Sequence, residues 1–274
     1  MKIVADSCCD ITVQEEMDYG VQIVPLTLFL GDESFIDDKN LDIEDYRTKL
    51  GLYQGRPTSA CPSPGDFLQA FREEEENFCL TVSANLSGTY SSALVAKEMA
   101  EEEGMKVEVI DSKTASAGQA LLVYEMLDLI KAGLKYEEIK EKIQDFIKNM
   151  KTYFVLENMD NLVKGGRLNK VAGKIITALH VHPIMGADGD GNIKLYNYGR
   201  TRKQIIDKMV GMVKECKEAS DNFKLVIAHH NNIELAESIK EAVNLAFESA
   251  VVKIVPTRGL CSMYADNKGV ILAF

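Results

Sequence analysis

The chain has 274 residues, of which 46% are hydrophobic and 27% charged, a composition typical of a soluble globular protein with room for two domains. Its formal net charge of −11, from 31 basic and 42 acidic residues, is offset by no basic stripe, which argues against a nucleic-acid-binding protein. No apolar run is long enough to cross a bilayer, and the first residues begin a strand pattern instead of a signal segment, so we expect a cytoplasmic protein.

Patterns of apolar residues predict alternating strands and helices in the first half of the chain. The predicted strands cover 2–5, 21–30, 78–82 and 107–110, and the predicted helices cover 12–19, 42–50, 64–76, 87–103, 116–131 and 136–150. Pro25 lies inside the long extended run 21–30, which suggests an edge strand or a covering strand. The alternation indicates a parallel sheet with helices on both faces.

The pattern restarts near Lys151 and predicts a second domain. Its strands are expected at 153–156, 181–185, 193–198, 225–229, 251–255 and 270–274, and its helices at 171–179, 201–217 and 233–247. Residues 164–167 are interpreted as a flexible turn and residues 188–192 as a turn between strands. We therefore predict an α/β protein with an N-terminal, parallel-sheet, Rossmann-like domain (1–151) and a smaller C-terminal α/β domain (152–274).

The six cysteines and four histidines match neither a disulfide framework nor a metal site. Cys8 and Cys9 are adjacent, and the pairs His180/His182 and His229/His230 have no Cys or carboxylate at ligand spacing. We predict free thiols and no bound metal. The motifs of dinucleotide-binding, Walker-type and serine-hydrolase sites are also absent.

Two hydroxyl-rich segments precede helices in the first half. One contains Thr58 and Ser59 in a predicted loop before a helix capped by Ser63, and the other contains Ser87 and Thr89. Helix N-termini carry unpaired N–H donors and a partial positive charge. If both segments face one cleft, they could hold a carboxylate or phosphate without any lysine or arginine.

Motifs along essentially the whole chain point to one family. They are Asp6-Ser7, Val24-Pro25-Leu26, Thr58-Ser59-Ala60-Cys61-Pro62-Ser63-Pro64, Leu86-Ser87-Gly88-Thr89-Tyr90, Val109-Ile110-Asp111-Ser112-Lys113, Lys164-Gly165-Gly166-Arg167, Pro183-Ile184 and Arg200-Thr201-Arg202-Lys203. In this order and spacing they resemble the DegV family, which includes the fatty-acid-binding B subunits of bacterial fatty acid kinase.

The resemblance implies two α/β domains with a long-chain fatty acid buried between them and no other cofactor. It assigns the carboxylate to the hydroxyls of Ser59, with Thr58 as the neighbouring option, and of Ser87. Gly88 and Thr89 would add backbone donors. The stretches 24–29 and 175–184 are our predicted lining for the acyl chain.

The sequence departs from the family pattern at two places. Ser59 stands where members usually have threonine, and Ala60 and Cys61 replace common Ser and Gln. Tyr264 lies at or near a histidine that many members carry close to the head group, and a tyrosine donates a hydrogen bond without exchanging a proton near neutral pH.

Three arginines match cationic positions of the kinase-coupled members. Arg167, Arg200 and Arg202 would lie on a surface that faces a kinase catalytic subunit, and an ordinary charged surface loop is the alternative. The partners that we expect are a long-chain fatty acid and a fatty acid kinase catalytic subunit, with peripheral contact with a membrane as a further option.

We predict a fatty-acid carrier that is not itself an enzyme, and two alternatives stay open. One is an enzyme acting on an acyl carboxylate or acyl phosphate with Ser59 or Ser87 as nucleophile, although no general base is evident beside them. The other is a regulatory protein in which the lipid is structural and is never released.

Overall fold

A four-stranded parallel sheet forms the first layer of the molecule. The computed structural model describes residues 1–168 and 181–274. The parallel sheet contains β1 (Lys2–Asp6), β2 (Gln22–Val24), β6 (Glu76–Thr81) and β7 (Lys106–Asp111), in the order β2-β1-β6-β7. The predicted parallel sheet is thereby confirmed. Consecutive β1 side chains are buried on opposite faces, Val4 against one helix layer and Ile3 against the other.

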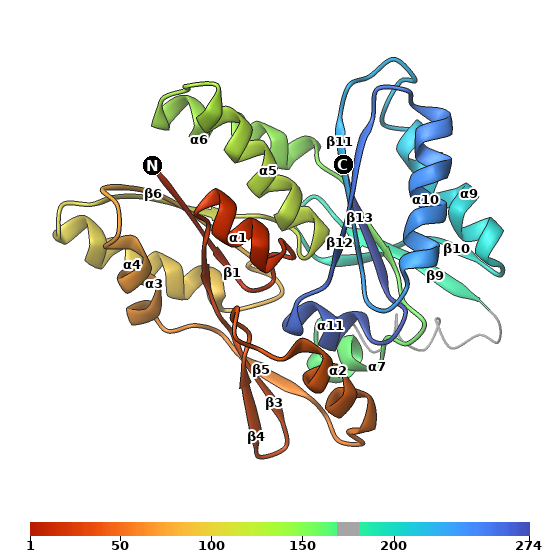
Figure 1. Ribbon diagram of the computed structural model, residues 1–274, viewed down its shortest axis with the longest axis horizontal. Coiled ribbons are helices and arrows are strands. Elements are labelled where there is room, and N and C mark those ends of the chain that lie inside the picture. The colour runs from red at the N-terminus through yellow and green to blue at the C-terminus, as the bar shows by residue number, and fades with distance from the viewer. Residues whose placement is uncertain (169–180) are drawn as a thin grey trace.

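The helix layers on the two faces have different roles. Helices α3 (Pro64–Phe71) and α4 (Thr89–Glu102) cover the face of Val4. Helices α5 (Ala117–Lys131) and α6 (Tyr136–Asn149) cover the other. Figure 1 shows α5 in the middle of the molecule. It contacts β6 on one side and β11 (Lys224–His229) and β13 (Val270–Ala273) of a second sheet on the other, so one continuous core joins the two sheets.

The second sheet is mixed and has six strands in the order β10-β9-β8-β13-β11-β12. Only β11 and β12 pair in parallel among its described strands. Helices α9 (Arg202–Lys214) and α10 (Ile233–Ala246) cover its outer face. Its strands are β8 (Thr152–Val155), β9 (His182–Ala187), β10 (Ile193–Gly199), β11 (Lys224–His229), β12 (Val251–Pro256) and β13 (Val270–Ala273).

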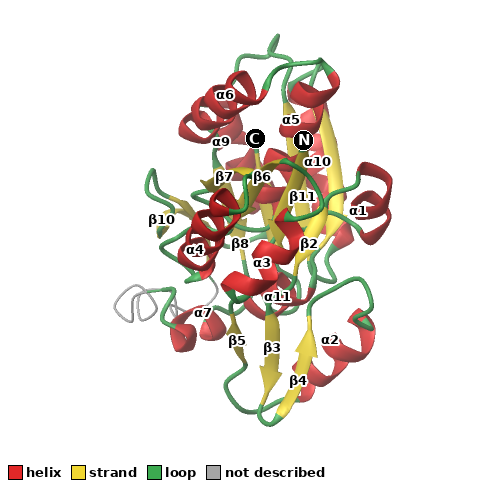
Figure 2. Cartoon of the chain, turned by 90° about the vertical axis from the view of Figure 1, so that its left-hand side faces the viewer, coloured by secondary structure: helices red, strands yellow, loops and turns green. Residues whose placement is uncertain are grey.

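A small antiparallel sheet projects from the molecule together with α2 (Ile43–Leu52), as Figure 2 shows. It consists of β3 (Thr27–Leu30), β4 (Glu33–Ile36) and β5 (Thr58–Ala60), in the order β4-β3-β5. Two predictions are corrected here. The extended run 21–30 divides at Pro25 into β2 and β3 of different sheets, because proline has no N–H for a ladder. Ser59 is not in a loop but in β5, opposite Leu28.

Helix starts agree with the sequence, and two short helices were missed. Capping boxes at Thr12 and Ser63 open α1 (Val13–Tyr19) and α3. The predicted turn 164–167 is instead the end of α7 (Asp160–Gly165), with Gly166 at a left-handed φ of 79°. Helix α11 (Gly259–Ala265) was not predicted. The helix expected at 171–179 lies outside the described residues.

Among the described helices we find none whose length and apolar character would let it span a membrane.

Candidate ligand-binding site

A pocket lies between the parallel sheet and the mixed sheet. Cys8 follows β1, Val82 follows β6 and Thr114 follows β7, and all three line it. The pocket therefore occupies the carboxyl ends of the parallel strands, which is where open α/β sheets bind their ligands.

The opposite wall comes from one face of the mixed sheet and from α11. Thr152, Phe154 and Leu156 alternate along β8 and just past its end, so all three point to the pocket. Leu260 and Tyr264 enter it from α11. Most lining side chains are apolar, so this wall favours a ligand with a large apolar part.

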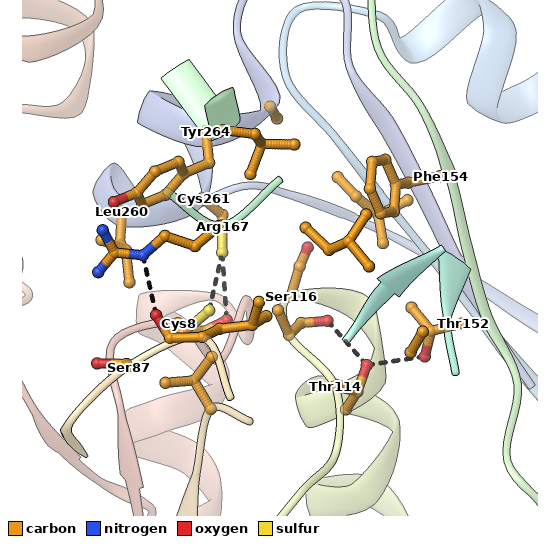
Figure 3. A pocket seen from close by; sticks show the side chains of 18 of the residues that line it. Cys8, Ser87, Thr114, Ser116, Thr152, Phe154, Arg167, Leu260, Cys261 and Tyr264 are labelled. Atoms are coloured by element: carbon orange, nitrogen blue, oxygen red, sulfur yellow. Dashed lines mark hydrogen bonds between the residues drawn. The ribbon is translucent and has the colours of Figure 1, made fainter. Parts of the chain in front are cut away.

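Arg167, Tyr264 and Ser87 lie on one side of the pocket, whereas Thr114 and Thr152, which hydrogen-bond to each other, lie on the other side with Phe154 (Figure 3). The Arg167 Nε donates to the Leu86 carbonyl at 2.9 Å and its Nη1 donates to the Gly165 carbonyl at 2.6 Å. Its guanidinium carbon lies 5.7 Å from the centre of the Tyr264 ring. Within the described part of the chain no carboxylate pairs with this cation, so Arg167 is available to an anionic ligand.

Two serine hydroxyls complete this polar side. Ser59 and Ser87 both line the pocket and are half-buried. The Ser87 hydroxyl shares a hydrogen bond of 2.8 Å with the Thr89 hydroxyl and accepts one of 3.3 Å from the Thr89 N–H. Ser59, Ser87, Arg167 and Tyr264 are thus the predicted site residues that the structure brings to one pocket.

The two hydroxyl-rich segments lie side by side, as expected. The Ser92 hydroxyl donates to the Pro62 carbonyl at 2.6 Å, and a Cβ added to Gly88 would lie 3.7 Å from the Cys61 sulfur. The start of α3 is not part of the pocket lining, and its own Ser63–Asp66 capping box occupies its first donors. The expected pair of free helix termini is therefore replaced by β5, the turn before α4 and an arginine.

Other predicted site residues lie outside the lining. Thr58 is exposed, and Gly88 and Thr89 are adjacent to the lining without joining it. Arg200 and Arg202 are exposed at the start of α9, where Arg202 pairs with Glu234 at 3.4 Å. Unlike them, Arg167 is part of the pocket.

The predicted acyl-chain lining was mostly wrong for the residues that the structure describes. In the stretch 24–29 only Leu26 lines the pocket. In the stretch 175–184, residues 175–180 lie outside the described part, and Ile184 is buried in the outer core of the mixed sheet. The alternation of side chains along β8 was the one signal that could have found lining residues. The sequence alone, however, does not say which face of that strand lines a pocket.

The β9–β10 turn closes the pocket and was predicted only as a turn. Gly191, Asn192 and Ile193 line the pocket. The Ser83 hydroxyl donates to the Gly191 carbonyl at 2.9 Å, and the Asn85 amide donates to the Asp190 carbonyl at 2.8 Å. These bonds fasten the mixed sheet to the segment that leads to Ser87.

Replacing Gly191 with alanine should lower the free energy of unfolding by about 1–3 kcal/mol, because Gly191 combines a positive φ with close packing. Its φ is +82°, and an added Cβ would lie 2.4 Å from the Ser83 Oγ and 2.9 Å from the Lys113 Cα. Gly189→Ala in the same turn is the control, since nothing lies within 4 Å of its Cβ position. Denaturant unfolding measures the free energy of unfolding of both variants. Equal values for Gly191→Ala and Gly189→Ala would contradict the role of Gly191.

Buried carboxylates hold α11 against the pocket. The Asp37 carboxylate accepts from the N–H groups of Gly259 and Leu260, each at 2.9 Å. Asp10 accepts from the Arg258 N–H at 2.6 Å and from the Ser116 hydroxyl at 2.5 Å. Burial raises the pKa of Asp10 to about 7, although both hydrogen bonds act in the opposite direction.

Asp6, from the first of the family motifs, is part of the core. Its carboxylate is fully buried and accepts from the Val82 and Cys8 N–H groups. Burial raises its pKa to about 6. Together with Asp10 it positions the turns around the pocket without lining it.

The described histidines do not assemble a metal centre. His230 is buried and burial lowers its pKa. Among the residues that the structure describes, no group of three or more His, Cys, Asp or Glu side chains could hold a metal ion.

The fold and the pocket define an α/β binding protein whose apolar cavity, with a cationic and hydroxyl-bearing side, lies between two sheets. A family model described as "Uncharacterised protein, DegV family" matches residues 1–272. The chain therefore belongs to the DegV family.

Curated and solved relatives agree with this assignment. A DegV domain-containing protein of Streptococcus pyogenes serotype M1 is 36% identical over 277 residues, covering 100% of this chain and 98% of its own. A solved DegV protein of Ruminococcus gnavus with vaccenic acid has a TM-score of 0.91 at 33% identity, covering 100% of this chain and 99% of that one. The Fak B3 protein of the Streptococcus pneumoniae fatty acid kinase, loaded with linoleic acid, has a TM-score of 0.91 at 33% identity, covering 100% and 98%.

Proposed function

We propose that this protein binds a long-chain fatty acid in the pocket between its sheets and carries it to a fatty acid kinase. The observation that carries the proposal is an apolar pocket whose polar side holds Ser59, Ser87 and an arginine without a carboxylate partner among the described residues. Relatives at 32–33% identity were solved with vaccenic, heptadecanoic and linoleic acid.

The energetics of such a ligand match the two sides of the pocket. Each buried CH₂ contributes about 0.8 kcal/mol, so a long chain against Phe154 and its neighbours supplies most of the affinity. A carboxylate taken out of water costs several kcal/mol unless it is paired and hydrogen-bonded. Arg167, Ser59 and Ser87 provide those partners, with Tyr264 beside them.

The surroundings of Ser87 support a carrier role rather than catalysis. Its hydroxyl bonds to Thr89, and the described lining contains no His, Asp or Glu side chain to accept a proton from it. We propose that 1–151 carries the carboxylate-binding segments and that 152–274 closes the pocket. Arg200 and Arg202, exposed and outside the lining, are the proposed contacts for the kinase subunit.

Organic-solvent extraction of the purified protein, followed by mass spectrometry, tests the ligand directly. We expect about one long-chain fatty acid per chain. Ser87→Ala should then raise the palmitate Kd about tenfold, because a hydrogen bond to a charged group is lost. Ser91→Ala, at an exposed serine of the helix α4 that follows Ser87, is the control and should bind normally. An empty extract together with unchanged binding by Ser87→Ala would disprove the site.

Ligand exchange separates a carrier from the alternatives. Rapid exchange of the bound acid for labelled palmitate fits a carrier, whereas a lipid that never exchanges fits a structural role. Turnover of acyl substrates that is lost in Ser87→Ala would instead support an enzyme.

A further inference from the structure

Two cysteine thiols face each other inside the pocket (Figure 3). Cys8 lies in the turn after β1 and Cys261 lies in α11, and both line the pocket. Their sulfurs are 3.6 Å apart, and the Cys261 thiol also donates to the Cys8 carbonyl at 3.3 Å. Only 4% of Cys8 and 6% of Cys261 is exposed, so a reagent reaches them through the pocket.

The backbone on each side of this pair is held by hydrogen bonds. The Cys8 N–H donates to Asp6 at 3.0 Å, and its carbonyl accepts from the Ser116 N–H at 3.1 Å. On the other side, Asp37 binds the first two N–H groups of α11. A disulfide needs its sulfurs about 2.05 Å apart. The two sulfurs must therefore approach each other by about 1.5 Å. We expect rotation of the two side chains to supply this movement while the backbone stays in place.

The surroundings raise the pKa of both thiols, but not to the same extent. Burial raises the pKa of Cys261 well above its usual value. The hydrogen bond with Cys261 favours the Cys8 thiolate, but burial and the carboxylates of Asp6 and Asp10 leave the pKa of Cys8 raised. Of the two thiols, Cys8 therefore has the less strongly raised pKa and forms a thiolate more readily.

We propose that Cys8 and Cys261 are a redox pair that a peroxide converts to a disulfide while the pocket is empty, and that a bound fatty acid shields the pair. The shielding rests on the proposed function. The Cys8 sulfur, as the thiolate that the Cys261 thiol stabilises by a hydrogen bond, attacks one peroxide oxygen; the O–O bond breaks, a sulfenic acid forms, and the leaving hydroxide takes the proton that Cys8 released and becomes water. The Cys261 sulfur then displaces the sulfenic oxygen, which leaves as water with the Cys261 proton, so that two thiols and one hydrogen peroxide give one disulfide and two waters.

The disulfide would act on the pocket because of where its two ends lie. It would join the turn after β1 to α11, the helix that carries Leu260 and Tyr264 into the pocket. The two residues are 253 positions apart in the chain. Oxidation would thus tie α11 covalently to the turn after β1 in the empty pocket. Whether the disulfide forms would depend on whether a fatty acid is bound.

The test treats delipidated protein and palmitate-loaded protein with hydrogen peroxide and maps disulfides by peptide mass spectrometry. We expect a peptide pair linking Cys8 and Cys261, lighter by two hydrogen atoms and restored by dithiothreitol. With palmitate at about ten times its Kd, about one-tenth of the protein is empty. The link should therefore form about tenfold more slowly. The exposed Cys61 and Cys216 report that the oxidant is active in both samples.

Cys9→Ser is the matched variant, since Cys9 is buried beside Cys8 but does not line the pocket, and it should form the link at the normal rate. Oxidation of Cys61 and Cys216 without a Cys8–Cys261 link would overturn the pair. Equal rates with and without bound palmitate would overturn the shielding. If the link forms in a protein that binds no palmitate, the proposed function fails and the redox pair stands.

Discussion

Replacing Arg167 with glutamine should raise the fatty-acid Kd about 10- to 100-fold, the largest effect on binding that we expect from a single side chain. A charge-assisted hydrogen bond is worth about 1.5–3 kcal/mol, and about 1.4 kcal/mol is a factor of ten in affinity. Arg167 lines the pocket beside Tyr264 and has no carboxylate partner in the described part of the chain. Glutamine can keep a donor for the Leu86 carbonyl while removing the charge.

A fatty alcohol of the same chain length separates charge from pocket shape. The alcohol fills the same apolar wall but carries no negative charge, so Arg167→Gln should bind it almost as well as the parent protein does. Calorimetry with both ligands measures the difference. Arg202→Gln, at an exposed site outside the lining, is the control. Equal losses for the acid and the alcohol would mean that Arg167 shapes the pocket instead of holding the carboxylate.

Replacing Asp10 with asparagine should change how stability depends on pH. Burial raises the pKa of Asp10 from 3.8 to about 7 in the folded protein. Between these values the folded protein keeps the proton and the unfolded chain has released it, so the free energy of unfolding falls as pH rises. This carboxyl therefore costs about 4 kcal/mol of stability above about pH 7 relative to acid conditions.

Asparagine does not titrate. The free energy of unfolding of the variant, taken relative to that of the parent protein, should therefore rise by about 3 kcal/mol between about pH 5 and about pH 8. Its amide can still accept from the Arg258 N–H and can donate toward Ser116. Urea unfolding at both pH values measures the change. Asp190→Asn, an exposed carboxylate in the β9–β10 turn, is the control. A difference that does not vary with pH would show that Asp10 is ionised throughout in the folded state.

The local patterns of the sequence were sufficient for most helices and strands. The capping boxes at Thr12 and Ser63, the alternation of strands with helices in the first half and the hairpin at 188–192 all depend on neighbours within a few positions. Local rules miss short elements that tertiary contacts stabilise. The seven-residue α11 and the three-residue β5 are examples, since α11 is held by Asp37 from a distant segment.

The sequence by itself determined the parallel sheet and the serine segments, because strand periodicity, helix caps and hydroxyl-rich motifs are written in adjacent residues. Only the tertiary structure decided that Arg167 joins Ser87, that Gly191 closes the pocket and that Cys8 meets Cys261. These groups are brought together by the packing of two sheets around α5. Such packing depends on the sum of many contacts between distant residues, and no short stretch of sequence records it.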